Sequence, residues 1–368
     1  MKRNVFAIFV VVLLIGVHAV SAEVSPREYF KFARFKFDKE DFNGAVEFLN
    51  KAIELDSKYS NAYLLRAEAF FMQGEFSLTI NDINKAFELE EAKTTFFARY
   101  YLIRGKSHIE LGDKKKGLAD IEKCLEISPN HAMAYYERSH LRYGIRNYDG
   151  AFQDINKAIE LESDEAVFYA GRAALKLNVY NPSANDKIYE SIIADFRKAI
   201  ALDPSNYDFY KQRSEFYRVT GSDMEALADY NAMIEINPQN NDVYRERGLL
   251  KMQKQDYRNA FQDFTQSIKL KPSDELSYRY RGMCAHNSRQ YNQAISDFSK
   301  AIEKLNESIL TTEEKDRLQN ILAETYLMRG HALQALGNSN EACFDFVKAY
   351  DLGVKKGLNY YRKFCGYY

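Results

Sequence analysis

The chain repeats itself at a period of 34 residues, and this constrains its fold more than any other feature. Tyr244-Arg-Glu-Arg-Gly248 recurs as Tyr278-Arg-Tyr-Arg-Gly282, and Pro238 recurs as Pro272. A unit of this size cannot bury its own apolar face, so stacked neighbours must supply a continuous core. The period therefore predicts an array of small units rather than one globular core.

Each unit has the residue spacing of two packed helices. Apolar and aromatic residues recur at intervals of three and four, which places them along one helix face. With only 6 Pro and 17 Gly in 368 residues, the chain has few turns for an all-β fold. Small residues mark the predicted approach of the two helices, namely Ala67, Gly105, Gly248, Gly282 and Gly330 opposite Ala45, Ala151, Ala226, Ala260, Ala294 and Ala342. Thr79, Gly117 and Ile192 depart from this rule.

These spacings, small residues and aromatics together resemble the tetratricopeptide repeat, a pair of antiparallel helices per unit. The resemblance implies an all-α fold, a right-handed α-solenoid of about nine helix-turn-helix units whose first helices line a concave surface. We place the repeats at 26–59, 60–93, 98–131, 132–165, 166–206, 207–240, 241–274, 275–308 and 323–356, followed by a C-terminal cap at 357–368.

Two insertions interrupt the period. Residues 178–185 are rich in turn formers and are expected between the two helices of the fifth repeat. Residues 309–322 begin with helix-capping side chains, and we expect them to lengthen the first helix of the ninth repeat.

Tyrosine, arginine and aspartate recur at fixed places. All nine repeats carry Tyr at the fourth position, which we interpret as core rather than as a ladder for stacking ligands. Repeats two to nine carry Arg three residues later and Asp in the second helix, whereas the first repeat has Phe32 and Phe48 there. Because pairing within a repeat leaves no orphan, we predict an Arg–Asp bridge inside each of the eight repeats.

The first 22 residues have the pattern of a secretory signal peptide. A basic start precedes an apolar run from Val5 to Val20, and Val20-Ser21-Ala22 is a small-residue cleavage site. The run is shorter than the roughly 20 residues of a spanning helix, although an uncleaved anchor is the alternative. We therefore expect an exported mature chain without a transmembrane segment, either secreted or in a periplasm, or alternatively in the lumen of the endoplasmic reticulum.

Four cysteines occur, at positions 124, 284, 343 and 365. None forms a C-x-x-C motif or has a His at zinc-ligand spacing, so we expect no metal site. Cys124 and Cys284 are expected to be core thiols. Cys343 and Cys365 belong to the last repeat and its trailing segment, where a disulfide is plausible in an oxidising compartment.

Neither catalytic nor cofactor motifs appear. The chain lacks G-x-S-x-G, H-E-x-x-H, a phosphate-binding Gly loop and G-x-G-x-x-G. The five His of the mature chain are spread over four repeats. We therefore expect a protein that is not an enzyme and needs no cofactor.

The expected concave surface changes character along the chain. At equivalent positions, apolar and aromatic side chains of the early repeats give way to basic ones in the later repeats. The predicted ligand-binding residues are the basic cluster Lys211, Arg218, Arg245 and Arg279 and the aromatic anchor Tyr136, His140 and Tyr143. The alternative is that these charges are paired, for example with Glu215 and Glu246, and bind nothing.

These patterns favour an exported, non-enzymatic scaffold that binds a protein or extended peptide, possibly an acidic one. The rival hypothesis is a recognition module for an anionic polymer, such as an envelope glycan or nucleic acid. The formal net charge of −1 gives no overall basic excess, which makes nucleic acid the less favoured ligand.

Overall fold

The structure, a computed structural model, describes residues 24–90, 94–179, 186–311 and 314–366. Every regular element in these ranges is a helix, which confirms the all-α prediction. Two compact units, Met1–Ser163 and Asp164–Tyr368, make up the chain and are described separately. The predicted signal peptide lies outside the described residues. No helix of the described ranges is both long and apolar enough to cross a membrane.

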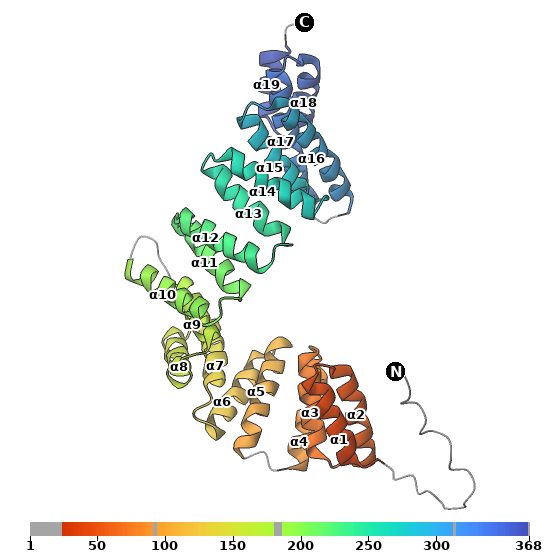
Figure 1. Ribbon diagram of the computed structural model, residues 1–368, viewed down its shortest axis with the longest axis vertical. Coiled ribbons are helices and arrows are strands. Elements are labelled where there is room, and N and C mark those ends of the chain that lie inside the picture. The colour runs from red at the N-terminus through yellow and green to blue at the C-terminus, as the bar shows by residue number, and fades with distance from the viewer. Residues whose placement is uncertain (1–23, 91–93, 180–185, 312–313, 367–368) are drawn as a thin grey trace, which may run out of the picture. The chain divides into compact units, whose positions relative to one another are not determined.

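The first unit is a row of antiparallel helix pairs (Figure 1). Its described helices are α1 (Pro26–Asp38), α2 (Phe42–Leu55), α3 (Ser60–Met72), α4 (Phe76–Leu89), α5 (Thr95–Glu110), α6 (Lys114–Ile127), α7 (Ala132–Gly144) and α8 (Tyr148–Leu161). Each pair corresponds to one predicted repeat. Only α5 begins before the position predicted for its repeat, by three residues.

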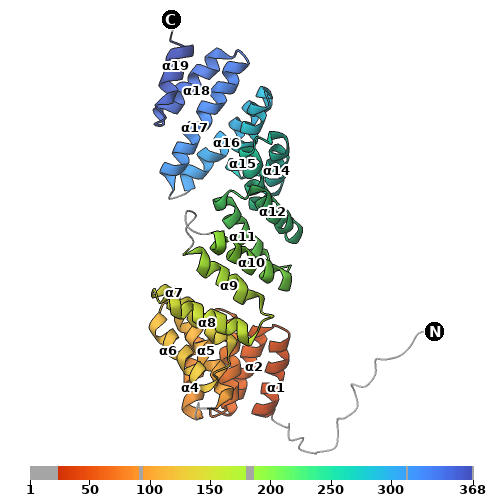
Figure 2. The ribbon, with the colours of Figure 1, turned by 90° about the vertical axis from the view of Figure 1, so that its left-hand side faces the viewer.

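The second unit continues the same helix pairs (Figure 2). Its described helices are α9 (Ala166–Leu177), α10 (Asp186–Leu202), α11 (Tyr207–Thr220), α12 (Asp223–Ile236), α13 (Asn241–Gln253), α14 (Tyr257–Leu270), α15 (Glu275–Asn287), α16 (Tyr291–Thr311), α17 (Lys315–Ala335), α18 (Ser339–Asp351) and α19 (Lys356–Phe364). The last of these is the predicted cap.

The insertion at 309–322 lengthens two helices rather than one. As predicted, α17 begins inside it, at Lys315, and α16 also runs on into it, so both helices have 21 residues. Leu318 and Ile309 from the added turns pack against buried Leu305 and Leu322. The insertion therefore extends the core between the eighth and ninth repeats instead of forming a surface loop.

The close approach of paired helices explains the small residues. A Cβ atom added at Gly248 would lie 2.9 Å from the ring of Phe264, and one at Gly330 would lie 2.7 Å from the ring of Phe346. Overpacking of this kind typically costs about 1–3 kcal/mol. Gly117, which breaks the small-residue rule, has a local cause, because a Cβ there would lie 2.5 Å from Ile109.

All eight predicted Arg–Asp bridges form inside their repeats. Arg213 is representative: its Nε and Nη2 donate to the two carboxylate oxygens of Asp229 at 3.0 and 2.6 Å. The aspartates are buried, at 1–8% exposure. The eight pairs are Arg66–Asp82, Arg104–Asp120, Arg138–Asp154, Arg172–Asp195, Arg213–Asp229, Arg247–Asp263, Arg281–Asp297 and Arg329–Asp345.

The fourth-position tyrosines belong to the same arrangement. In each of the eight repeats the guanidinium lies over the ring of that Tyr, 5.3–5.8 Å from its centroid. Several hydroxyls are bonded locally, as predicted: Tyr135 donates to the carbonyl of Pro129 at 3.1 Å and Tyr210 to that of Pro204 at 3.2 Å. These rings are therefore structural.

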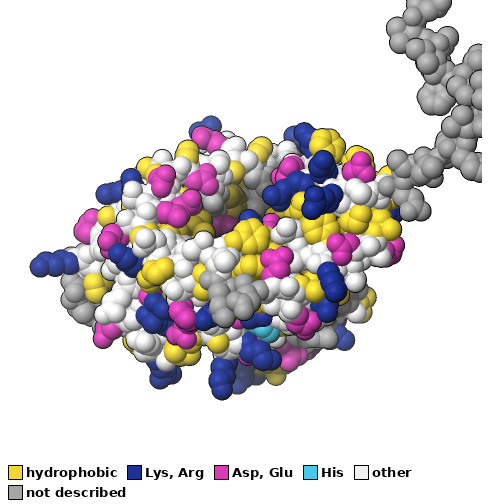
Figure 3. All heavy atoms as spheres, turned by 90° about the horizontal axis from the view of Figure 1, so that it is seen from below, with side chains coloured by type: hydrophobic (Ala, Val, Ile, Leu, Met, Phe, Trp, Pro, Cys, Tyr) yellow, Lys and Arg dark blue, Asp and Glu magenta, His cyan; other side chains and the backbone are white. Residues whose placement is uncertain are grey.

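Charges of both signs are spread over the surface. On the face shown in Figure 3, Lys and Arg side chains lie among Asp and Glu side chains and hydrophobic ones. Ion pairs three residues apart, such as Lys123–Glu126 and Lys157–Glu160, also lie on the surfaces of the described helices. That face therefore carries no extended field of one sign.

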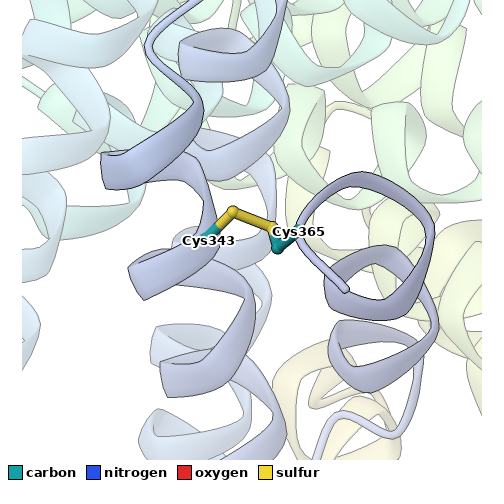
Figure 4. Close-up of a disulfide and its surroundings, with 2 residues drawn as sticks. All are labelled: Cys343 and Cys365. Atoms are coloured by element: carbon teal, nitrogen blue, oxygen red, sulfur yellow. A yellow bond between two sulfur atoms is a disulfide. The ribbon is translucent and has the colours of Figure 1, made fainter. Parts of the chain in front are cut away.

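The cap is held to the last repeat by aromatic packing and a disulfide. Tyr360 and Phe364 of α19 lie 5.7 and 6.2 Å from the ring of Phe346 on α18. Cys343 on α18 is bonded to Cys365 at the end of α19, with 5.9 Å between their Cα atoms (Figure 4). Cys124 and Cys284 are free and buried, as predicted.

We expect the Arg213–Asp229 bridge to show strong coupling. Either Arg213→Ala or Asp229→Ala leaves a buried charge without its partner, which typically costs about 3–5 kcal/mol. The double variant should lose less than the sum of the two, as measured by urea unfolding in a double-mutant cycle. Simple additivity would show that the pair contributes no mutual stabilisation.

Thiol counting tests the cysteine assignment. Burial raises the pKa of the Cys124 and Cys284 thiols to about 12, so both should resist a thiol reagent at pH 8 in the native protein. We expect two reactive thiols after denaturation and four after denaturation with a reductant. Four thiols without reductant would contradict the disulfide.

Candidate functional site

The predicted binding residues all lie on the first helices of their repeats. Tyr136, His140 and Tyr143 lie on α7 of the first unit, and Lys211, Arg218, Arg245 and Arg279 lie on α11, α13 and α15 of the second. The basic cluster and the aromatic anchor thus belong to different units, and we treat them as separate surfaces.

Arg245 is engaged with carboxylates rather than free. Its guanidinium lies 2.9 Å from Asp274, the N-cap residue of α15, and 2.8 Å from Asp242 on its own helix. Asp274 is buried and also accepts a hydrogen bond from Ser277 at 2.7 Å. Although burial acts to raise it, these hydrogen bonds and the charge of Arg245 hold the pKa of Asp274 below its usual value.

Arg279 does not have the exposure that we predicted for the basic cluster. It is only 7% exposed, and its Nη2 donates to Glu324 of the ninth repeat at 2.7 Å. Its guanidinium also lies over the ring of Tyr280. The prediction of an exposed anchor here was wrong, because the next first helix, lengthened by the insertion, places a carboxylate directly beside it.

The other two basic residues are more open. Arg218 is paired with Glu246 at 2.9 Å, the pairing that the alternative interpretation anticipated. Lys211 is exposed, and no carboxylate of the described residues lies within ion-pair distance of it. Of the four predicted anchors, Lys211 is therefore the one whose charge is available to a partner.

The predicted aromatic anchor is partly packed away. The rings of Tyr136 and His140 meet edge to face at 4.7 Å, and Tyr143 lies 4.9 Å from Tyr148. The Nε2 atom of His140 is buried and has no hydrogen-bond partner among the described residues. Burial lowers the pKa of His140, so this imidazole is neutral at pH 7.

Three hollows lie along the first helices of the second unit. One, of about 300 Å³ between α11 and α13, is lined by Glu215, Arg218, Val219, Asp223, Leu250 and Gln253. A second, of about 450 Å³ between α17 and the cap, is lined by Glu324, Leu327, Met328, Val354, Lys355 and Lys356. The third, of about 110 Å³ between α15 and α17, is lined by Met283, His286, Asn287, Phe298, Met328 and His331.

Sequence reasoning missed most of these lining residues. It identified Arg218 as a ligand-binding residue, but not Met283, Met328 or Lys355 and Lys356. Comparing equivalent positions of the repeats samples only a few residues of each first helix. The hollows instead form where neighbouring helices are offset from one another. Residues Val354–Lys356 are the last three of the ninth repeat, beyond the end of its second helix α18 at Asp351.

Comparisons with known families and proteins agree with this architecture. Residues 98–131, 242–274 and 323–352 match a model described as Tetratricopeptide repeat, and residues 35–74 match one described as TPR repeat. The rat DnaJ homolog subfamily C member 3 is 27% identical over 200 residues, 52% of this chain and 39% of that protein. Mouse Tetratricopeptide repeat protein 16 is 25% identical over 186 residues, 48% of this chain and 23% of that protein.

A solved structure shows the same fold over most of the chain. The human IFIT1 dimer with PPP-AAAA superposes with a TM-score of 0.50 at 16% identity and covers 90% of this chain and 73% of that one. The fold is thus an α-solenoid, and four of its segments match tetratricopeptide-repeat models. It spans about two fifths of the length of its rat relative.

Because Arg245 is paired with a buried carboxylate, replacing it should lower the free energy of unfolding. Arg245→Ser leaves the buried Asp274 carboxylate without its cation, which should cost about 1–3 kcal/mol of unfolding free energy. Lys211→Ser should stay within about 0.5 kcal/mol of wild type, since that side chain is exposed. Chemical denaturation of both variants at pH 7 measures the difference.

The loss of unfolding free energy in Arg245→Ser should also depend on pH. A carboxyl whose folded pKa is depressed stabilises the fold above its unfolded pKa, and that contribution is lost as the pH falls through the folded pKa. The difference in unfolding free energy between wild type and Arg245→Ser should therefore shrink as the pH falls through the folded pKa of Asp274, which lies below its usual value. A gap that is constant with pH would show that the ion pair is not its cause.

Proposed function

We propose that the chain is an exported, non-enzymatic scaffold that binds a protein or an extended peptide along the first helices of its repeats. The observation that carries this proposal is the pair of open hollows on the second unit, between α11 and α13 and between α17 and the cap. Each combines apolar side chains with charged ones at its edge, as peptide sites usually do.

The hollow beside the cap is the better developed of the two. Leu327, Met328 and Val354 supply apolar surface, while Lys355 and Lys356 are exposed at its rim. Methionine adapts its shape readily, which suits a surface that accepts varied side chains. This arrangement supports an apolar side chain flanked by an acidic group as the preferred element of a partner.

Two features support export. The signal-like leader at 1–22 predicts passage across a membrane, and the Cys343–Cys365 disulfide is of a kind that persists in oxidising compartments. Sequence relatives among the DnaJ homologs favour a protein-interaction role. Binding of an anionic polymer is less well supported, because Arg218, Arg245 and Arg279 are already paired with carboxylates.

Site-directed photo-crosslinking in cells that make the protein tests this proposal. A photoreactive residue at Gln253 or Lys355, each at a hollow, should yield protein adducts. The matched controls are Glu235 and Gln262, exposed residues on the second helices α12 and α14. Adducts should come from an exported fraction in which the chain begins at Glu23.

Two outcomes would contradict the proposal. Equal adducts from the control positions would place the partner on the other face of the repeats. A chain that stays with the cytosolic fraction and keeps residues 1–22 would contradict export while leaving the binding surface to be judged by the adducts alone.

A further inference from the structure

Two imidazoles and two thioethers line the small hollow between α15 and α17. Met283 and His286 are three residues apart on α15, and Met328 and His331 are three residues apart on α17. Residues at this spacing share one helix face. Each helix therefore presents one sulfur-bearing and one nitrogen-bearing side chain to the same cavity of about 110 Å³.

The nitrogen atoms of both imidazoles are uncommitted. Within the described ranges neither His286 nor His331 makes a side-chain hydrogen bond or ion pair. Their rings are instead held by edge-to-face contacts, His286 against Tyr291 at 5.5 Å and His331 against Tyr360 at 4.3 Å. Packing thus fixes the orientation of the rings while their nitrogen lone pairs remain unused.

His286 and His331 line the hollow from two different helices, and the imidazole nitrogen is the commonest metal ligand in proteins.

The donor set is soft. No carboxylate or thiol lines this hollow, whereas calcium and magnesium require oxygen ligands and zinc sites use Cys, His, Asp or Glu. The described residues hold no group of three or more His, Cys, Asp and Glu suited to a metal ion, so any site here needs the thioethers. Thioether and imidazole together are ligands that suit monovalent copper.

We propose that this hollow binds one Cu(I) ion through Met283, His286, Met328 and His331. The site lies between two adjacent first helices, so the ion would also link the eighth repeat to the ninth. This inference concerns a different hollow from the two used in the peptide-binding proposal, although Met328 lines both this hollow and the one beside the cap. The competing use of the cavity is as a dry pocket for an apolar side chain.

An anaerobic competition experiment tests the proposal on the full mature chain. Cu(I) is titrated into the protein with the chromogenic chelator bicinchoninate as competitor. We expect the protein to withhold one equivalent of Cu(I). Met283→Leu combined with Met328→Leu keeps the cavity apolar and nearly the same size but removes both sulfurs, and should weaken binding at least 100-fold. Met252→Leu, on the first helix α13 of the preceding repeat, is the matched control and should change affinity less than twofold.

Two further measurements keep the result interpretable. Cys124→Ala with Cys284→Ala should still bind one Cu(I), which separates the proposed site from the buried thiols. Ag(I), a redox-inert probe, should shift the methyl NMR signals of Met283 and Met328 but not that of Met252 in the wild-type protein. The proposal is overturned if the chelator keeps all the Cu(I), if the double Leu variant binds like wild type, or if binding disappears with the two thiols.

Discussion

The fold depends on a three-residue contact that recurs in eight repeats: a tyrosine ring, an arginine lying over it and an aspartate that the arginine holds in two places. The aspartate is buried in every case, so a carboxylate left without its cation would destabilise the helix pair. Because the arginine comes from the first helix and the aspartate from the second, the contact also sets how these helices face each other. The small residues at 248, 282 and 330 then permit the distance that the bridge requires.

Most of this arrangement could be predicted from the sequence, because each part lies inside one repeat. The 16-residue interval from Arg66 to Asp82 recurs, and the first repeat loses both partners together, so the pairing followed from counting. The residue spacing did not reveal that the tyrosine ring is part of the same contact. The tyrosines looked like ordinary core residues, and their contact with the guanidinium depends on side-chain direction rather than on spacing.

The candidate site was less predictable because its contacts join one first helix to the next. Arg245 meets Asp274, the N-cap residue of α15, across 29 residues, and Arg279 meets Glu324 of α17 across 45 residues and an insertion. Such partners depend on how neighbouring units stack, which no single repeat encodes. The hollow between α15 and α17 shows the same difficulty: aligning the eighth repeat with the ninth places Met283 opposite His331, so the convergence of four donors on one cavity is hidden.

The first and the last described repeats differ in the contacts that stabilise them. A linear array of repeats loses structure from its ends, where a unit has a neighbour on one side only. At the amino end, the first pair of helices has Phe32 against Phe48 at 5.6 Å in place of an ion pair, with Phe32 half exposed. At the carboxyl end, a covalent bond ties the cap to α18. We therefore expect the helices of the first described repeat to open more readily than the helices around the third hollow, which lie beside the bonded cap.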